Sequence, residues 1–123
     1  MLKRAGAMNL ELKKSNPPLY KEKMDLVRSL IVESVDREIL KKVYLFGSYA
    51  YGEPDGQSDL DLCVVISDSS KRTDAYLDIA KALNRNDIIL YDLLVYNEQY
   101  FYGAKNPNGV EHTIMETGRL LYG

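Results

Sequence analysis

The stretch of sequence that decides the fold is LFGSYAYGEPDGQSDLDLCVV, which runs from Leu45 to Val65. It opens within an apolar run that is rich in β-branched and aromatic residues, and such a run favours a buried strand. Gly47 and Ser48 interrupt this run, ten residues follow, and a second segment with alternating polar and apolar side chains begins at Asp59. The stretch therefore predicts two strands that are joined by a turn-rich loop.

Two acidic side chains, Asp59 and Asp61, are expected on one face of the second strand. Side chains two positions apart on a strand project to the same side, roughly 6–7 Å apart along the chain. Neighbouring carboxylates repel each other and are costly to desolvate unless a cation lies between them, and hard oxygen ligands suit Mg²⁺. A turn such as Gly47-Ser48 after a strand exposes backbone N–H groups that bind phosphate, and the serine adds a hydroxyl. The sequence thus predicts a divalent-metal site beside a phosphate site.

The order Gly47-Ser48, ten residues, Asp59-Leu60-Asp61 resembles the signature of the DNA polymerase β-like nucleotidyltransferase superfamily. The short chain resembles the minimal nucleotidyltransferase branch of this superfamily, which includes MntA-type antitoxins encoded beside HEPN-type toxins. The resemblance implies an α+β fold, with a small mixed β-sheet and helices packed mainly on one face. It also implies transfer of a nucleoside monophosphate, AMP from ATP in this family, to a hydroxyl acceptor. In that reaction Asp59 and Asp61 would bind two Mg²⁺ ions, while Gly47 and Ser48 would hold the nucleotide phosphates.

Asp92 is the candidate third metal ligand. It interrupts an apolar, strand-like run over residues 88–96, where a lone acidic side chain is costly unless it binds a cation or hydrogen-bond donors. The resembled family has a third carboxylate on such a strand, and Asp92 matches that place by its position after a predicted helix; Asp87, in the preceding turn, is the second candidate. The resemblance implies that Asp92 completes the metal ion that binds the acceptor hydroxyl and accepts its proton. The alternative is an edge strand on which Asp92 lies in water.

One position departs from the family pattern. Tyr51 stands where many members have an arginine, which would add positive charge near the phosphates. Its absence puts turnover and triphosphate affinity in question, and Lys71 or Arg72 are cations that could substitute. The resemblance implies an antitoxin that transfers the nucleotide to its HEPN-type toxin partner, and two alternatives to this protein-modifying transferase stay open. One is an antitoxin with weak or no catalytic activity that neutralises its partner by contact. The other is a transferase for a small molecule such as an aminoglycoside, which at this chain length needs a homo-oligomer or an open site.

Length and composition bound the class of protein. A chain of 123 residues has the length of a single domain. We expect this domain over residues 16–123 and a flexible tail over residues 1–15. The formal net charge of −2 argues against nucleic acid as the main partner. The single cysteine, Cys63, excludes an internal disulfide, fits a reducing cytoplasm, and is expected to pack as a small apolar group. No apolar run is long enough to predict a membrane span.

Periodicity and turn residues predict the remaining elements. Apolar side chains at helical spacing from Met24 to Val35 indicate a long helix that packs on the sheet, and Asp68 to Ser70 are expected to cap the next helix. His112, the only histidine, is expected at the surface or facing a partner rather than in catalysis. The predicted helices cover residues 18–39, 49–52, 70–84, 97–102 and 110–117, the predicted strands cover 42–46, 59–65 and 88–96, and residues 120–122 are expected to dock the end of the chain.

Overall fold

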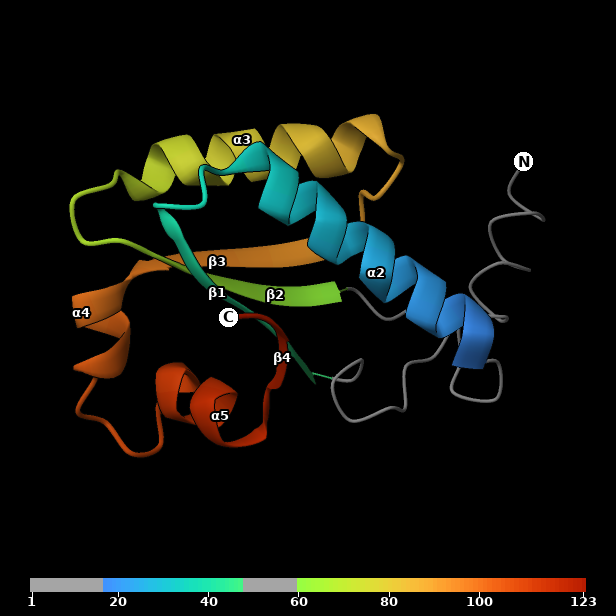
Figure 1. The fold of residues 1–123 in the computed structure, drawn as a ribbon. Helices are drawn as coiled ribbons and strands as arrows, with labels where there is room; N and C mark the ends of the chain where they lie inside the picture. Colours follow the sequence, from blue (N-terminus) through green and yellow to red (C-terminus); the bar gives the residue numbers. More distant parts are fainter. Residues whose placement is uncertain (1–16, 48–59) are drawn as a thin grey trace.

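The protein, as a computed structural model, is described over residues 17–47 and 60–123, with side chains from residue 21 onward within those ranges. The described strands form one mixed four-stranded sheet in the order β3-β2-β1-β4 (Figure 1). β1 (Leu40–Phe46) pairs antiparallel with β2 (Leu60–Ile66) and with β4 (Arg119–Tyr122). β3 (Tyr91–Asn97) runs parallel to β2 and forms one edge of the sheet.

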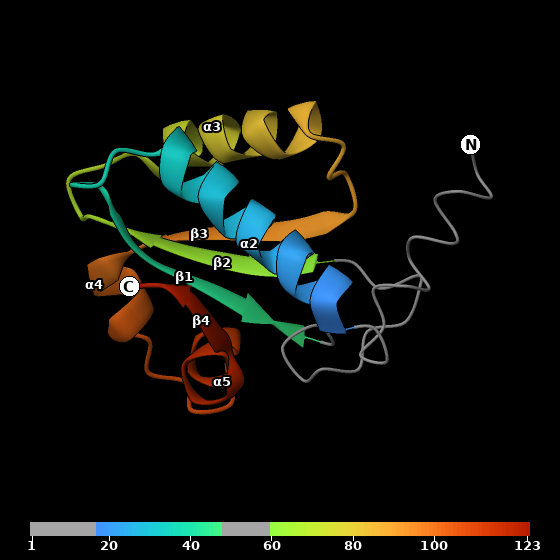
Figure 2. The same cartoon turned by 45° about the vertical axis from the view of Figure 1, so that its right-hand side comes forward.

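The two longer helices cover one face of the sheet (Figures 1 and 2). They are α2 (Pro17–Ser34) and α3 (Arg72–Arg85). The helical spacing predicted for the first of them is confirmed, because its apolar stripe is buried in the core of this face. That core includes Met24, Val27, Ile31, Val43, Leu45, Leu62, Val64, Ile79 and Leu83.

The opposite face of the sheet is partly covered by two short helices, α4 (Glu98–Tyr102) and α5 (Val110–Thr117). A second, smaller core lies between them and the sheet, formed by Tyr44, Cys63, Val65, Phe101 and Ile114. β2 is therefore buried on both faces, which explains why its second half reads Leu-Cys-Val-Val-Ile with no polar residue. The predicted fold class, α+β with a small mixed sheet and the main helices on one face, is confirmed.

Two predicted boundaries differ from the structure. The helix predicted to reach residue 39 ends at Ser34, because the carbonyl of Asp36 accepts hydrogen bonds from the amides of Ile39 and Leu40 and turns the chain into β1. The strand predicted from residue 88 begins at Tyr91. Its first apolar residue, Ile88, instead closes α3 by donating its amide to the Leu83 carbonyl and is buried in the core. An apolar residue at position 88 fits either the start of a strand or a packing contact at the end of a helix, so the sequence alone could not distinguish between them.

Two further local predictions were wrong or incomplete. The residue that precedes α3 is Lys71, and no side chain caps that helix, so the predicted cap from Asp68 to Ser70 is not formed. The loop is held instead by Asn97, whose Nδ2 donates to the carbonyls of Ser67 and Ser70 at 2.8 and 2.9 Å. The last residues of the chain, expected only to dock, form the strand β4. Short-range patterns do not reveal such pairings because the partner strand is far away in the sequence.

Several predictions concern residues that the structure does not describe. These are the tail over residues 1–15 and the short helix over residues 49–52. Among the helices in the two described ranges, none has both the length and the apolar character that a bilayer crossing requires.

Candidate functional site

Asp61 and Asp92 lie side by side on neighbouring strands. Each is the second residue of its strand, and the register of the parallel β2–β3 pair places them directly opposite one another. Opposite residues project to the same face, and paired strands lie about 4.8 Å apart. That face is the one covered by α4 and α5, because Cys63 and Val65, which share the parity of Asp61, belong to the smaller core. The pair therefore forms a two-carboxylate cluster where β2 and β3 begin.

Gly47 positions one of these carboxylates. Its backbone has φ +72°, a left-handed conformation that side chains with a Cβ rarely adopt. A Cβ at this position would collide with Oδ2 of Asp61 and lie 3.0 Å from its Cγ. β1 ends at Phe46, which pairs with Asp61, so the turn after β1 brings the chain against the carboxylate. Glycine is required here on two grounds: its conformation and the close approach of Asp61.

The predicted environment of Asp92 was partly wrong. β3 is an edge strand and Asp92 is exposed. The alternative prediction, in which Asp92 lies in water on an edge strand, is therefore confirmed, and the prediction of a buried carboxylate in a central strand was wrong. Its neighbour Asp61 is half-buried. Asp87, the second candidate, lies in the turn after α3 with φ +62° and not on the strand. Asp59, Ser48 and Tyr51 lie outside the described residues, so Gly47 is the one predicted phosphate-binding residue that the structure describes.

The donor set of the described pair fits a hard divalent cation. Two carboxylates on adjacent strands offer oxygen ligands, and the exposure of Asp92 leaves room for the waters that Mg²⁺ retains. Residues 21–47 and 60–123 contain no group of three His, Cys, Asp or Glu side chains that could hold a metal. A complete ligand set of protein carboxylates would therefore need an acid from outside those ranges, and Asp59 is the predicted one.

The thiol and imidazole near this face have structural environments. Cys63, two residues beyond Asp61, is fully buried, and this burial, together with the charge of Glu111, raises the pKa of its thiol to about 12. Such a thiol is not a nucleophile at neutral pH, which confirms its predicted packing role. His112 is half-buried, and its Nε2 donates to the Ala104 carbonyl at 2.7 Å, so it joins α5 to the preceding loop. The imidazole thus braces the fold, a role that the expected surface position did not foresee.

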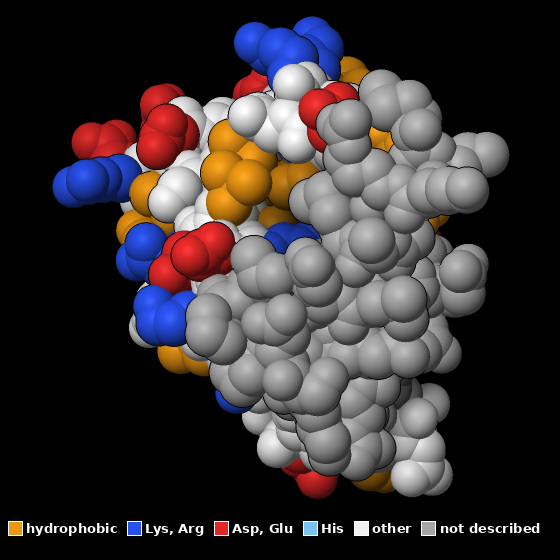
Figure 3. Space-filling view, turned by 90° about the vertical axis from the view of Figure 1, so that its right-hand side faces the viewer, with side chains coloured by type: hydrophobic (Ala, Val, Ile, Leu, Met, Phe, Trp, Pro, Cys, Tyr) orange, Lys and Arg blue, Asp and Glu red, His pale blue; other side chains and the backbone are white. Residues whose placement is uncertain are grey.

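The cations expected to substitute for the family arginine lie away from the acidic pair. Lys71 and Arg72 stand at the start of α3, which follows the far end of β2, so they are not placed to replace the family arginine. Figure 3 shows Lys and Arg side chains interspersed with Asp and Glu over the described part of one face, without a continuous basic patch.

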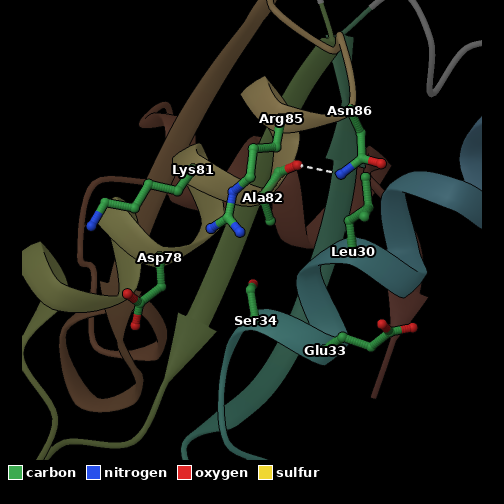
Figure 4. Close-up of a pocket in the computed structure, with 8 residues that line it drawn as sticks. All are labelled: Leu30, Glu33, Ser34, Asp78, Lys81, Ala82, Arg85 and Asn86. Carbon is green, nitrogen blue, oxygen red and sulfur yellow. Dashed lines mark hydrogen bonds between the residues drawn. The ribbon is translucent and has the colours of Figure 1, made fainter.

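A pocket of about 400 Å³ lies between α2 and α3, on the sheet face opposite the acidic pair (Figure 4). Acidic and basic side chains line it in equal number, and its single marked hydrogen bond joins Asn86 Nδ2 to the Ala82 carbonyl at 2.8 Å. It has no side chain in common with the two-carboxylate cluster. Its lining residues are Leu30, Glu33, Ser34, Asp78, Lys81, Ala82, Arg85 and Asn86.

Comparison with known proteins places these features in a family. The sequence model of the family "Polymerase beta, Nucleotidyltransferase" matches residues 28–123. A protein of Methanocaldococcus jannaschii named "Putative protein adenylyltransferase" is 32% identical over 92 residues, which cover 74% of this chain and 87% of that protein.

Solved structures show the same fold. A crystal structure of a toxin–antitoxin with AMP-PNP has a TM-score of 0.60 at 23% identity, and the match covers 81% of this chain and 73% of that one. A crystal structure of a mutant of the toxin–antitoxin MntA–HpeT has a TM-score of 0.57 at 20% identity, and covers 81% and 72%. At these identities the likeness is one of fold. With the family match over most of its length, the chain belongs to the polymerase beta nucleotidyltransferase family and is a nucleotidyltransferase.

Proposed function

We propose that this nucleotidyltransferase moves AMP from ATP to a hydroxyl group on a protein, and that it serves as the antitoxin of a HEPN-type toxin. The observation that carries the proposal is the placement of Asp61 and Asp92 side by side against the turn at Gly47. A protein named as an adenylyltransferase matches most of this chain, and solved toxin–antitoxin structures, one of them with AMP-PNP, share its fold.

Asp59, Asp61 and Asp92 are the proposed ligands of two Mg²⁺ ions, and Gly47 and Ser48 are the proposed phosphate-binding residues. When bound, the ions would supply positive charge at the attacking and leaving oxygens of an in-line displacement at phosphorus. In such a displacement the acceptor oxygen forms a bond to the α-phosphorus, and pyrophosphate leaves. Gly47 contributes by allowing the chain to close on Asp61, which restricts the orientation of that carboxylate.

The exposure of Asp92 bears on the acceptor. An exposed carboxylate on an edge strand is reachable by a hydroxyl that another protein carries on its surface. In the proposal Asp92 accepts the proton of that hydroxyl as its oxygen attacks. A small-molecule acceptor would need an enclosing wall, whereas a protein acceptor brings its own surface to the site. This geometry favours the protein-modifying function over the aminoglycoside-type alternative.

The test is label transfer with the intact chain and the co-expressed product of the neighbouring gene. Label from ATP carrying ³²P at the α-phosphate should appear on the partner in the presence of Mg²⁺, and label at the γ-phosphate should not. Removal of Mg²⁺ by EDTA should abolish transfer. Asp61→Asn and Asp92→Asn should each lower the rate by about 100-fold or more, because each removes a charged ligand while preserving shape.

Asp87→Asn is the matched control, because it removes a carboxylate from a turn and asparagine tolerates the positive φ of that position. It should leave the rate unchanged. Transfer that survives the double substitution Asp59→Asn and Asp61→Asn would overturn the enzymatic proposal. If that double variant still neutralised the toxin with unchanged affinity, the contact-only antitoxin would be the correct alternative.

A further inference from the structure

The edge strand β3 presents a row of backbone groups that no other described segment of the chain uses. The amide of Leu60 donates to the Leu90 carbonyl at 3.1 Å, and this bond fixes the phase of the parallel ladder. In a parallel ladder alternate residues point their N–H and C=O groups toward the neighbouring strand. The groups of Tyr91, Leu93 and Val95 consequently face away from β2. No hydrogen bond between described residues uses them.

Apolar side chains flank this free edge. Tyr76 and Leu77 on α3 are 41% and 49% exposed, and with Val95 they line a hollow of about 260 Å³. Ile89 and Leu90, directly before the strand, are 69% and 55% exposed. Natural edge strands are usually protected by lysine, proline or a bulge, and β3, with the sequence YDLLVYN, has neither lysine nor proline. An open edge beside exposed apolar side chains is typical of a surface that pairs with another strand.

We propose that β3 pairs antiparallel with β3 of a second copy of this chain, so that the two sheets become one continuous sheet across a two-fold axis. Such an interface must be complementary to itself. With Leu93 on the axis, the outward groups of Tyr91 meet those of Val95 in the second copy, so the free donors and acceptors are satisfied reciprocally. The one charged residue of the strand, Asp92, then lies opposite Leu94, and no like charges face each other.

The helix above the edge is also suited to its own copy. Ala75, Ile79 and Leu83 of α3 face the core, and Asp78, Ala82 and Arg85 face α2, as Figure 4 shows. The flank of α3 that lines the hollow beside β3 carries Thr73, Tyr76 and Leu77, and its one charged residue is Arg72 at the first position of the helix. With the axis at Leu93 the two copies of α3 run antiparallel, so the two Arg72 residues lie at opposite ends of the contact and do not face each other, and the approach would cover Tyr76. The proposal does not depend on the transferase function, since the contact is made by backbone groups of β3 and by α3, while the side chain of Asp92 stays on the sheet face of α4 and α5.

The first test is the mass and amide exchange of the purified chain, alone, from about 1 µM to about 1 mM. Sedimentation equilibrium should show a monomer–dimer equilibrium. Amide exchange followed by NMR should show Leu93 and Val95 protected at high concentration and at least 10-fold less protected after dilution. Asp92 and Leu94, whose amides face β2, should stay protected throughout. A monomer at every concentration, or outward amides whose exchange ignores concentration, would overturn the proposal.

Two variants and a control locate the contact. Val95→Pro removes an outward N–H without touching the ladder to β2, and Leu77→Glu places a charge beside the hollow without altering the strand. Each should weaken dimerisation at least 10-fold, whereas Leu26→Glu, on the 43% exposed position of α2, should not. If Val95→Pro fails to fold, as circular dichroism would show, Leu77→Glu decides. If neither folded variant weakens the dimer, the two copies are in contact elsewhere. If the outward amides of β3 are protected only when a different protein is added, β3 pairs with that protein. Either result refutes the second-copy interface.

Discussion

Replacing Gly47 by alanine tests whether the turn after β1 positions the acidic pair. Two effects act against the substitution. An L-residue with a Cβ at φ +72° loses about 1–2 kcal/mol relative to a right-handed conformation. In addition, the new Cβ collides with Oδ2 of Asp61, so that side chain must leave its rotamer at a further 0.5–1.5 kcal/mol, approximately. The free energy of unfolding should fall by about 1.5–3.5 kcal/mol in total.

A double-mutant cycle separates the two effects. In an Asp61→Ala background the carboxylate is gone and only the Cβ of residue 61 remains, at 3.4 Å, which is an ordinary contact. Gly47→Ala should then lower the free energy of unfolding by the conformational part alone, about 1–2 kcal/mol. The assay is equilibrium urea unfolding of the four proteins of the cycle.

The comparison of Gly47→Ala in the two backgrounds decides whether Asp61 lies in close contact with Gly47. If Gly47→Ala lowers stability equally in both backgrounds, Asp61 does not press against Gly47 and the argument for a positioned carboxylate fails. Activity supplies the second readout, since a displaced Asp61 should lower the rate of AMP transfer more than the loss of stability explains. A Gly47→Ala enzyme that is stable enough to remain folded and fully active would equally contradict the proposed positioning.

Three further predictions concern side chains on β2 and β3. Burial raises the pKa of the Cys63 thiol to about 12, well above the roughly 8.5 of an unfolded chain. The free energy of unfolding should therefore fall as pH rises from about 9 toward 12, and urea unfolding at several pH values should show a shallower fall for Cys63→Ala. Asn97→Ala should lower stability by about 1–3 kcal/mol in thermal unfolding, because two backbone carbonyls of the loop before α3 lose their donor. Tyr96→Phe removes a 2.8 Å hydrogen bond to Glu111 and should lower stability by about 1–2 kcal/mol, and an unchanged melting temperature would mean that water replaces the hydroxyl.

Much of the architecture was predictable because it depends on local periodicity. The buried stripe of α2, the strand character of β2 and the bounds of α5 all follow from apolar spacing and from the glycines around α5, whereas the burial of β2 on both faces was not predicted. The errors lie where contacts between residues that are distant in the sequence determine the local structure. Ile88 packs beneath the end of α3 instead of opening β3, and the last four-residue strand exists only because β1 offers it an edge.

The candidate site was likewise predictable only in part. The chain order was enough to select Asp92 over Asp87 as the neighbour of Asp61. Its exposure was not predictable, because whether a strand lies at the centre or the edge of a sheet is set by the order of strands and not by its own residues. For the same reason the close approach of Asp61 to Gly47 could not be foreseen, although a glycine at the end of an apolar strand signals that some group comes near.

The position of Asp92 depends on side chains that never approach it. A slip of β3 by one residue against β2 would turn Asp92 to the face of α2 and α3 and turn Leu93 out of the core. Leu93 is 8% exposed and packs with that core, so the slip would expose a large apolar side chain and bury an unpaired carboxylate. Both consequences are unfavourable, which locks the register. The burial of Leu93 therefore acts on the chemistry as well as on stability, because it fixes the register that holds the acidic pair together although one of its members is exposed to solvent.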